Sequence, residues 1–125
     1  MIEAYSTNVQ VAGGSPIPFN STTIKKGNTA VHASDATIDL NKCGVYMVSV
    51  DGVAEASTTV QLYKNGVPQP QAQSTGTAVS FMTLVQVPYD NTCNICSSPT
   101  SIQIYNESST DATFDIAHIV VTKVI

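Results

Sequence analysis

Basic side chains are scarce in this sequence: its 125 residues include five Lys and Arg against nine Asp and Glu, for a formal net charge of -4. So few cations could hold little of a phosphate backbone, which argues against nucleic acid as a partner. No apolar stretch approaches the roughly 20 residues of a membrane-spanning helix. Residues 1–10 also lack the basic start and continuous apolar run of a signal peptide. We therefore expect a protein that is made in the cytoplasm and does not insert into a membrane.

Groups that could carry catalysis are equally few. The sequence has two histidines, His32 and His118, and neither is visibly paired with a Ser or Cys nucleophile. Asp35 and Asp39 share a strand face but flank a turn, as solvated carboxylates commonly do. A cupin-like enzyme would need His and Glu ligands on facing strands, and no His-x-His pattern supplies them. We therefore predict no catalytic residue, no cofactor and no metal site, and we interpret His118 as a core or interface residue.

Short strands fill the chain instead. With 125 residues, of which 42% are hydrophobic, the chain can bury the core of one domain. Asn65-Gly66 is the sharpest turn signal, because a type I′ hairpin turn needs positive φ at both central residues, and residues 68–76 are also expected to be a turn region. The pattern predicts one all-β domain over 1–125, with 1–15 as an amino-terminal strand or arm, in which two antiparallel sheets pack as a sandwich or jelly roll. The expected strands, rich in Val, Ile, Thr and aromatic residues with a period of two, are 5–11, 29–33, 36–40, 45–53, 58–63, 78–87, 101–105 and 113–124.

Three of these strands are apolar on both sides. A strand that covers one side of a core is normally polar on the other side, so a second apolar side needs a cover of its own. Contiguous apolar surface usually marks an interface, and the alternative is cover by loops or by residues 2–11 of the same subunit. The two sides are Tyr46, Val48 and Val50 against Val45 and Met47; Phe81, Val85 and Val87 against Met82 and Leu84; and Phe114, Ile116 and Val120 against Ala117, Ile119 and Val121.

The order of motifs from Ile17 to Ile125 resembles the tumour necrosis factor/complement-C1q-like (TNF/C1q-like) jelly roll. It is closest to the small bacterial and bacteriophage members, such as fibre or head-surface domains. The Gly-Asp that usually follows the long strand is replaced by Pro88-Tyr89-Asp90, and no collagen-like Gly-X-Y tract is present, so the calcium site of some animal members is not carried over. The motifs that carry the resemblance are IPFN from Ile17, IDL from Ile38, GVYMVSV from Gly44, VQLYKNG from Val60, VSFMTLVQV from Val79 and FDIAHIVVTKV from Phe114.

The resemblance implies a homotrimer. In these jelly rolls one sheet packs on the core of its own subunit, and its outer face packs against two neighbouring subunits around a threefold axis. Tyr46, Val48 and Val50 would then fill the core of the sandwich. The residues expected at the trimer interface are Val45, Met47, Met82, Leu84, Ala117, Ile119 and Val121.

The resemblance also implies a non-enzymatic surface or fibre domain of a phage or bacterial particle. Such a domain would be made in the bacterial cytoplasm without a signal peptide and would lie on the surface of a virion or other particle that is assembled inside the cell and released by lysis. Besides itself, its expected partners are a host-surface glycan or other particle proteins, because loops rich in Ser, Thr, Asn, Gln and Tyr suit sugar hydroxyls. The alternatives are a monomeric carbohydrate-binding module and, less well supported, a cupin-like enzyme.

Three cysteines, Cys43, Cys93 and Cys96, form a possible thiol cluster under the jelly-roll order. That order places the strand from Gly44 antiparallel to the strand ending at Val87, which brings Cys43 near the Cys-x-x-Cys loop. Such spacing can serve redox exchange or half of a zinc site, but structural zinc normally has four ligands and a fourth is not evident. Plain thiols, a disulfide formed after release and a metal site are the alternatives.

Overall fold

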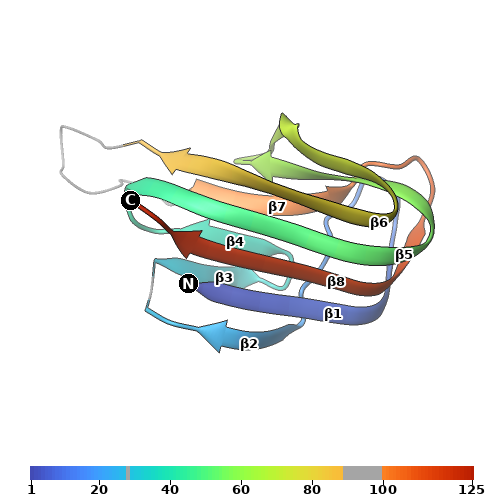
Figure 1. Cartoon of the computed structure of the whole chain (residues 1–125), viewed down its shortest axis with the longest axis horizontal. Helices are drawn as coiled ribbons and strands as arrows, with labels where there is room; N and C mark the ends of the chain where they lie inside the picture. The colour runs from blue at the N-terminus through green and yellow to red at the C-terminus, as the bar shows by residue number, and fades with distance from the viewer. Residues whose placement is uncertain (28, 89–99) are drawn as a thin grey trace.

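The computed structural model describes residues 1–27, 29–88 and 100–125. Strands account for most of these residues, and no helix occurs among them. The chain forms two antiparallel layers that face each other (Figure 1). The strands are β1 (Ile2–Val11), β2 (Ser21–Lys25), β3 (Ala30–Ser34), β4 (Thr37–Leu40), β5 (Gly44–Lys64), β6 (Val67–Val87), β7 (Thr100–Asn106) and β8 (Ala112–Lys123).

The two long strands, β5 and β6, belong to both layers. Residues 44–53 of β5 pair with β8 and with the second half of β6, whereas residues 60–64 pair with β7. The β5–β6 pairing shifts between Val53 and Thr58, where the hairpin passes from one layer to the other. The β1 layer therefore has the order β2-β1-β8-β5-β6, and the β7 layer has the order β3-β4-β7-β5-β6. This is the two-sheet antiparallel sandwich expected from the sequence.

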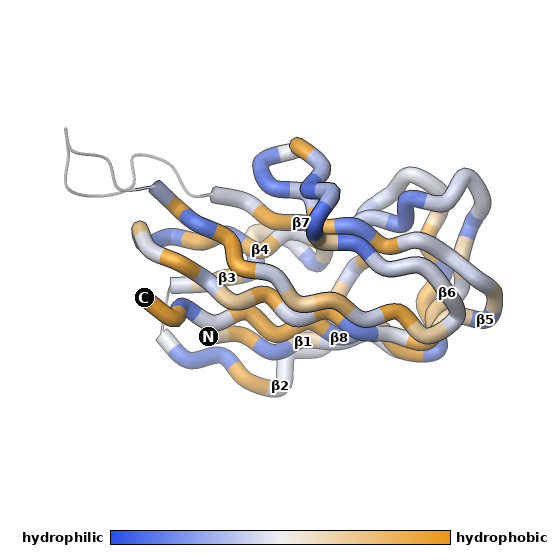
Figure 2. Tube along the Cα trace, turned by 45° about the horizontal axis from the view of Figure 1, so that its top comes forward, coloured by the Kyte–Doolittle hydropathy of each residue, from blue (hydrophilic) through white to orange (hydrophobic). Residues whose placement is uncertain are grey.

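The core lies between the two layers and has the side chains expected on β5. Tyr46 and Val48 are fully buried and Val50 is 3% exposed. Hydrophobic residues occur along β1, β5 and β8 (Figure 2), and in β5 every second residue from Tyr46 to Val50 is buried. The other large side chains of the core are Phe114, Ile2, Ile17, Ile38, Leu40, Leu62, Ile102, Ile104 and Ile119.

The Tyr46 hydroxyl bonds the backbone of the loop that precedes β5. It donates to the carbonyl oxygen of Lys42 at 2.9 Å and lies 3.2 Å from that of Thr29, and it accepts from the Lys42 amide at 3.1 Å. Burial raises the pKa of Tyr46. The phenol thus bonds both backbone groups of Lys42 and links this loop to Thr29, whose carbonyl oxygen also accepts from the Asn41 amide at 2.8 Å.

Tyr46→Phe should lower the free energy of unfolding by about 1 to 2 kcal/mol, because the ring still fills the core but the Lys42 backbone loses the hydroxyl that bonds it. Urea unfolding followed by circular dichroism measures the change. Tyr5→Phe removes a hydroxyl from a partly exposed ring and is the matched control, with an expected change within about 0.5 kcal/mol. An equal loss in both variants would contradict this role of the Tyr46 hydroxyl.

The β5–β6 hairpin turn confirms one local prediction and corrects another. Asn65 and Gly66 have φ of 51° and 80°, as the type I′ signal predicted. Residues 68–76, however, belong to β6 and are not a turn region. Pro68 is tolerated there because, among the described strands, β6 pairs with β5 alone, and an edge strand can lack a backbone donor.

Asn106 at the end of β7 is a buried polar junction. Its amide nitrogen donates to the carbonyl oxygens of Val11 and Thr110 at 3.1 and 3.2 Å. Its side-chain oxygen accepts from the Thr58 hydroxyl at 3.0 Å and from the Ser108 amide at 3.1 Å. These bonds join the end of β1, the corner of β5 and the β7–β8 turn at one end of the sandwich.

Candidate interaction surfaces

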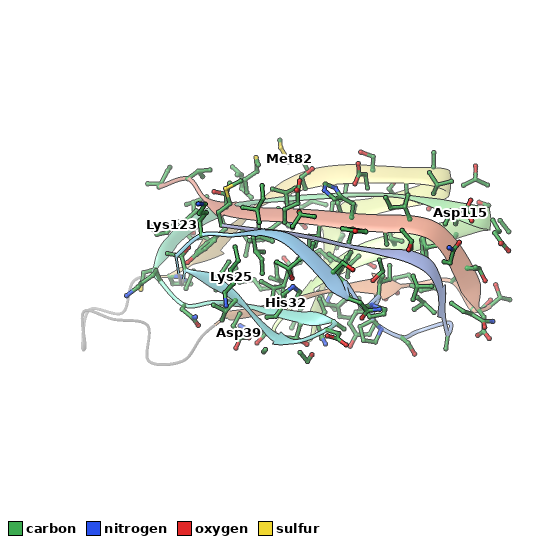
Figure 3. All side chains as sticks on the ribbon, turned by 90° about the horizontal axis from the view of Figure 1, so that it is seen from below. Lys25, His32, Asp39, Met82, Asp115 and Lys123 are labelled. Atoms are coloured by element: carbon green, nitrogen blue, oxygen red, sulfur yellow. The ribbon has the colours of Figure 1, made fainter. Side chains whose placement is uncertain are left out.

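The outer surface of the β1 layer carries large exposed apolar side chains, and we call it the apolar face. Met82 and Leu84 of β6 are 64% and 59% exposed, and Val53 of β5 and Ile116 of β8 are 43% and 39% exposed. The strand register makes these side chains neighbours: Met47 lies opposite Leu84, and Val53 lies opposite Ile116. Figure 3 shows Met82 projecting outward from this face. The exposed apolar side chains therefore gather on one layer in two groups, around Met47 and Leu84 and around Val53 and Ile116, with the Asp51–His118 pair between them.

The structure places four of the seven predicted interface residues on this face. Val45 and Met47 of β5 and Met82 and Leu84 of β6 point outward and are partly or largely exposed. The outward side of β5 was predicted from the alternation of Val45 and Met47 with Tyr46 and Val48, which are buried.

The other three predicted interface residues are in the core, which corrects the prediction. Ala117, Ile119 and Val121 are 3%, 1% and 0% exposed. The cause is an extra residue in β8: Val53 pairs with Ile116 and Ala54 with Phe114, so one step along β5 corresponds to two along β8. Such a bulge reverses the alternation of faces in the residues that follow it. The outward residues of β8 beyond the bulge are Ile116, His118 and Val120.

Three ionisable side chains from different strands meet near the centre of the apolar face, and we call them the histidine cluster. The Nδ1 atom of His118 lies 2.7 Å from Oδ1 of Asp51 on β5. Its Nε2 atom lies 3.1 Å from Oε2 of Glu3 on β1, and Glu3 accepts a further hydrogen bond from the Thr23 hydroxyl at 2.6 Å. Both carboxylates were missed in the sequence, because only the pairing of β1 and β5 with β8 brings them together.

The carboxylates favour the charged form of His118. Burial lowers the pKa of His118, but the hydrogen bonds to Glu3 and Asp51 and their negative charges outweigh burial, so the pKa lies above its ordinary value of 6.5. The hydrogen bonds from Thr23 and then from His118 hold the pKa of Glu3 below its ordinary value of 4.5. The cluster thus contains a flanked imidazolium and two carboxylates around pH 6. It contains no nucleophile, so the arrangement is suited to pairing charge and not to covalent catalysis.

An open groove lies next to the cluster on the same face. Its volume is about 320 Å³, and it is lined by Asp51, Gly52, Val53, Ala78, Val79, Ser80, Ile116 and His118. A Cβ atom at Gly52 would lie 2.8 Å from the carbonyl oxygen of Ile116, so a larger residue would push β5 and β8 apart. The groove walls are mostly apolar, so a protruding apolar side chain could fill it.

The outer surface of the β7 layer has a different chemistry, and we call it the polar face. It presents amide, hydroxyl and phenol groups from three adjacent strands. Figure 3 shows Asp39 on the side of the sandwich opposite Met82. The side chains that alternate outward there, all partly exposed, are Thr37 and Asp39 of β4, Gln61 and Tyr63 of β5, and Ser101, Gln103 and Tyr105 of β7.

Side-chain contacts hold the polar face in place. The rings of Tyr63 and Tyr105 stack with centroids 4.1 Å apart and planes inclined by 30°. The Tyr63 hydroxyl donates to Oε1 of Glu107, and this hydrogen bond is the main cause that raises the pKa of Tyr63 to about 12. Gln103 donates to the Thr37 hydroxyl at 2.9 Å, and its side-chain oxygen lies 3.4 Å from the Tyr105 hydroxyl.

The remaining residues singled out in the sequence do not form a catalytic or metal-binding site within the described ranges. His32 is half-buried, with Nδ1 3.2 Å from the carbonyl oxygen of Ser34. Asp35 is exposed, and Asp39 accepts a hydrogen bond from the Ser101 hydroxyl at 2.8 Å. No group of three or more His, Cys, Asp or Glu that could hold a metal ion occurs in residues 1–27, 29–88 and 100–125. These ranges also contain no helix of the length and apolar character that a membrane span requires.

The thiol cluster is described only in part. Cys43, just before β5, is disulfide-bonded. The strand that follows it pairs as the jelly-roll order implied, with Gly44 opposite Val87. Cys93 and Cys96 lie outside the described residues.

Comparison with known proteins identifies the fold. No family model matches the chain, and a search of curated proteins gives no match. Among solved structures, the globular domain of zebrafish complement 1qA has a TM-score of 0.76 at 11% identity, covering 99% of this chain and 96% of that one. The Eiger TNF of S. frugiperda has a TM-score of 0.67 at 11% identity, covering 99% and 92%. PRD1 vertex protein P5 has a TM-score of 0.62 at 13% identity, covering 99% and 96%. The chain has the TNF/C1q-like jelly-roll fold.

Proposed function

We propose that this chain forms a homotrimer through its apolar face and acts as a non-enzymatic surface or fibre domain of a virion or bacterial particle. One observation carries the proposal: large apolar side chains, Met82 and Leu84 above all, are exposed together on one layer. A soluble domain that leaves such a patch uncovered as a monomer is prone to associate through it. A closed threefold assembly would cover the patch in every subunit at once.

The chemistry of the apolar face suits a contact between identical subunits. The centres of homomeric interfaces are more apolar than ordinary surface, and charged groups there must be paired. Met47, Leu84 and Ile116 supply apolar area, while His118 lies between two carboxylates of its own subunit. The groove beside Gly52 offers space for a side chain of a neighbouring subunit. The β1 layer is also the sheet through which the resemblance implies trimer formation.

Placement on a particle surface is supported by the fold shared with PRD1 vertex protein P5, which is named as a vertex protein. An apolar face turned to the threefold axis would leave the polar face directed outward, where it can meet a host surface or other particle proteins. The histidine cluster and the polar face both lack a recognisable nucleophile with its base in the described part of the chain, so we assign no enzymatic activity.

The experiment that tests the trimer is light scattering on size-exclusion fractions at micromolar concentration. We expect three times the 13.2 kDa mass of one chain. A mass of one chain at that concentration would refute the trimer. The second candidate is a monomeric carbohydrate-binding module. The observation that would then support it is the stacking of Tyr63 and Tyr105 on the polar face.

A further inference from the structure

We propose that the polar face contains a binding site for a neutral, hexose-containing glycan, centred on Tyr63 and Tyr105 and completed by Gln61, Gln103 and Thr37. The inference rests on the proposed function in one respect, that trimer formation leaves this face outward. It adds the site, the residues that form it and the chemical class of the ligand.

The aromatic pair is the first reason. Tyr63 and Tyr105 come from adjacent strands, their rings stack at 4.1 Å, and both side chains remain partly exposed. The C–H side of a hexose packs on aromatic rings, and tyrosine adds a polar rim. Because the hydrogen bond to Glu107 holds the Tyr63 ring in place, binding would order few additional side-chain torsions. The pair is therefore a preformed platform.

The amides around the rings are the second reason. The register places Gln61 opposite Tyr105 and Gln103 opposite Tyr63, so an amide flanks each ring on the neighbouring strand. Gln103 is itself held by its hydrogen bond to Thr37 at 2.9 Å. An amide offers both donors and an acceptor, and a hydroxyl does the same, which matches the mixed hydrogen bonding of sugar hydroxyls. A few fixed polar groups around an apolar platform are what a small-ligand site requires.

The charges around the site select the class of glycan. The ionised side chains at its margin are the carboxylates of Asp39 and Glu107, which contact Ser101 and Tyr63. Lys64 follows Tyr63 in β5, but its ammonium group donates to the backbone of Gln86. Neither carboxylate forms an ion pair among residues 1–27, 29–88 and 100–125, and unpaired carboxylates repel uronic and sialic acids. The ligand should therefore be a neutral sugar.

Saturation-transfer NMR and tyrosine fluorescence can test the site on the full chain. The fluorescence reports on the site because the sequence has five Tyr and no Trp. The probes are maltohexaose, cellohexaose and a β-linked galactotetraose, with a tetragalacturonate as the anionic counterpart. We expect at least one neutral probe to bind with a Kd below about 1 mM and the tetragalacturonate not to bind. Tyr105→Ala and Gln103→Ala should each weaken binding by about tenfold or more.

Gln10→Ala is the matched control, because it removes the same amide from an exposed position of β1 in the other layer. It should leave the Kd unchanged. All three variants should elute like the wild type, so lost binding would not reflect lost assembly. Absence of binding to all three neutral probes at about 1 mM, preferred binding of the tetragalacturonate, or binding unaffected by Tyr105→Ala would overturn the site.

The outcome separates this inference from the proposed function. A wild-type trimer that binds none of the neutral probes refutes the glycan site and leaves the trimer standing. A wild-type monomer that binds one of them, and loses it in Tyr105→Ala, supports the site and refutes the homotrimer.

Discussion

Met47→Lys should abolish the trimer, giving a monomer or a chain that fails to fold. Met47 points outward from β5, between Leu84 on β6 and Thr122 on β8. In the proposed assembly the substitution places an ammonium group from each of three subunits in a desolvated contact near the axis. Removing such a group from water costs several kcal/mol, and the three like charges also repel one another. Light scattering on size-exclusion fractions is the measurement.

Two further variants make this result interpretable. Met82→Lys changes a side chain that is 64% exposed in the single chain, so it should dissociate the trimer without unfolding the subunit. Circular dichroism would show the retained strands. Gln71→Lys adds the same charge at an exposed position of β6 and should remain trimeric. If both methionine variants stay trimeric, the apolar face is not the subunit contact.

Much of the fold could be predicted because its core strands follow simple alternation. In β5 the buried Tyr46 and Val48 were separated correctly from the outward Met47 by position alone. β2 was missed for the opposite reason: it lies at an edge, pairs only with β1, and buries no residue fully, so its sequence carries no alternation to detect. A strand is predictable from sequence to the extent that it has one buried side.

Alternation also explains the main error. In β8 the extra residue at Asp115 leaves both Asp115 and Ile116 exposed, and every later residue changes sides. Counting from the buried Phe114 therefore placed Ile119 on the wrong face. A bulge in a strand that is apolar on both sides leaves no mark in the hydrophobic pattern, because either phase buries apolar side chains.

The candidate sites were less predictable than the fold, because they depend on register between distant strands. Glu3, Asp51 and His118 are brought together only when β1 and β5 pair on either side of β8. The composition predicted a surface rich in amides and hydroxyls, but it did not predict that these groups gather on the outer surface of the β7 layer. The stacking of Tyr63 on Tyr105 follows from the pairing of β5 with β7.

The histidine cluster should make the stability of the assembled protein depend on pH, with the largest effect above pH 6.5. The pKa of His118 in the folded protein is raised above its ordinary 6.5. The stabilisation is therefore complete below that value and is lost as pH rises through the raised pKa. Deprotonation also leaves two uncompensated carboxylates in each subunit, Glu3 and Asp51, at the proposed interface. Above the raised pKa, repulsion between these carboxylates on different subunits lowers the stability of the assembled protein further.

Glu3 determines the lower end of the pH range in which the histidine cluster stabilises the protein. Its pKa is lowered from 4.5, so its stabilisation is present above that value and is lost as pH falls through the depressed pKa. The contribution of the cluster is therefore greatest between about pH 4.5 and 6.5. The groups are partly exposed, and added salt should weaken the effect.

Urea unfolding midpoints and trimer mass, measured between about pH 5 and 9, test the prediction. In the wild type both the midpoint and the trimer fraction should fall from about pH 6 to 9. His118→Gln should largely remove this dependence, because its amide nitrogen can still donate to a carboxylate but the side chain does not titrate. His32→Gln replaces the other histidine of the sequence, which lies on β3 away from the cluster, and should keep the wild-type pH profile. A midpoint that rises across this range, or a profile that His118→Gln leaves unchanged, would show that the paired imidazolium does not stabilise the apolar face.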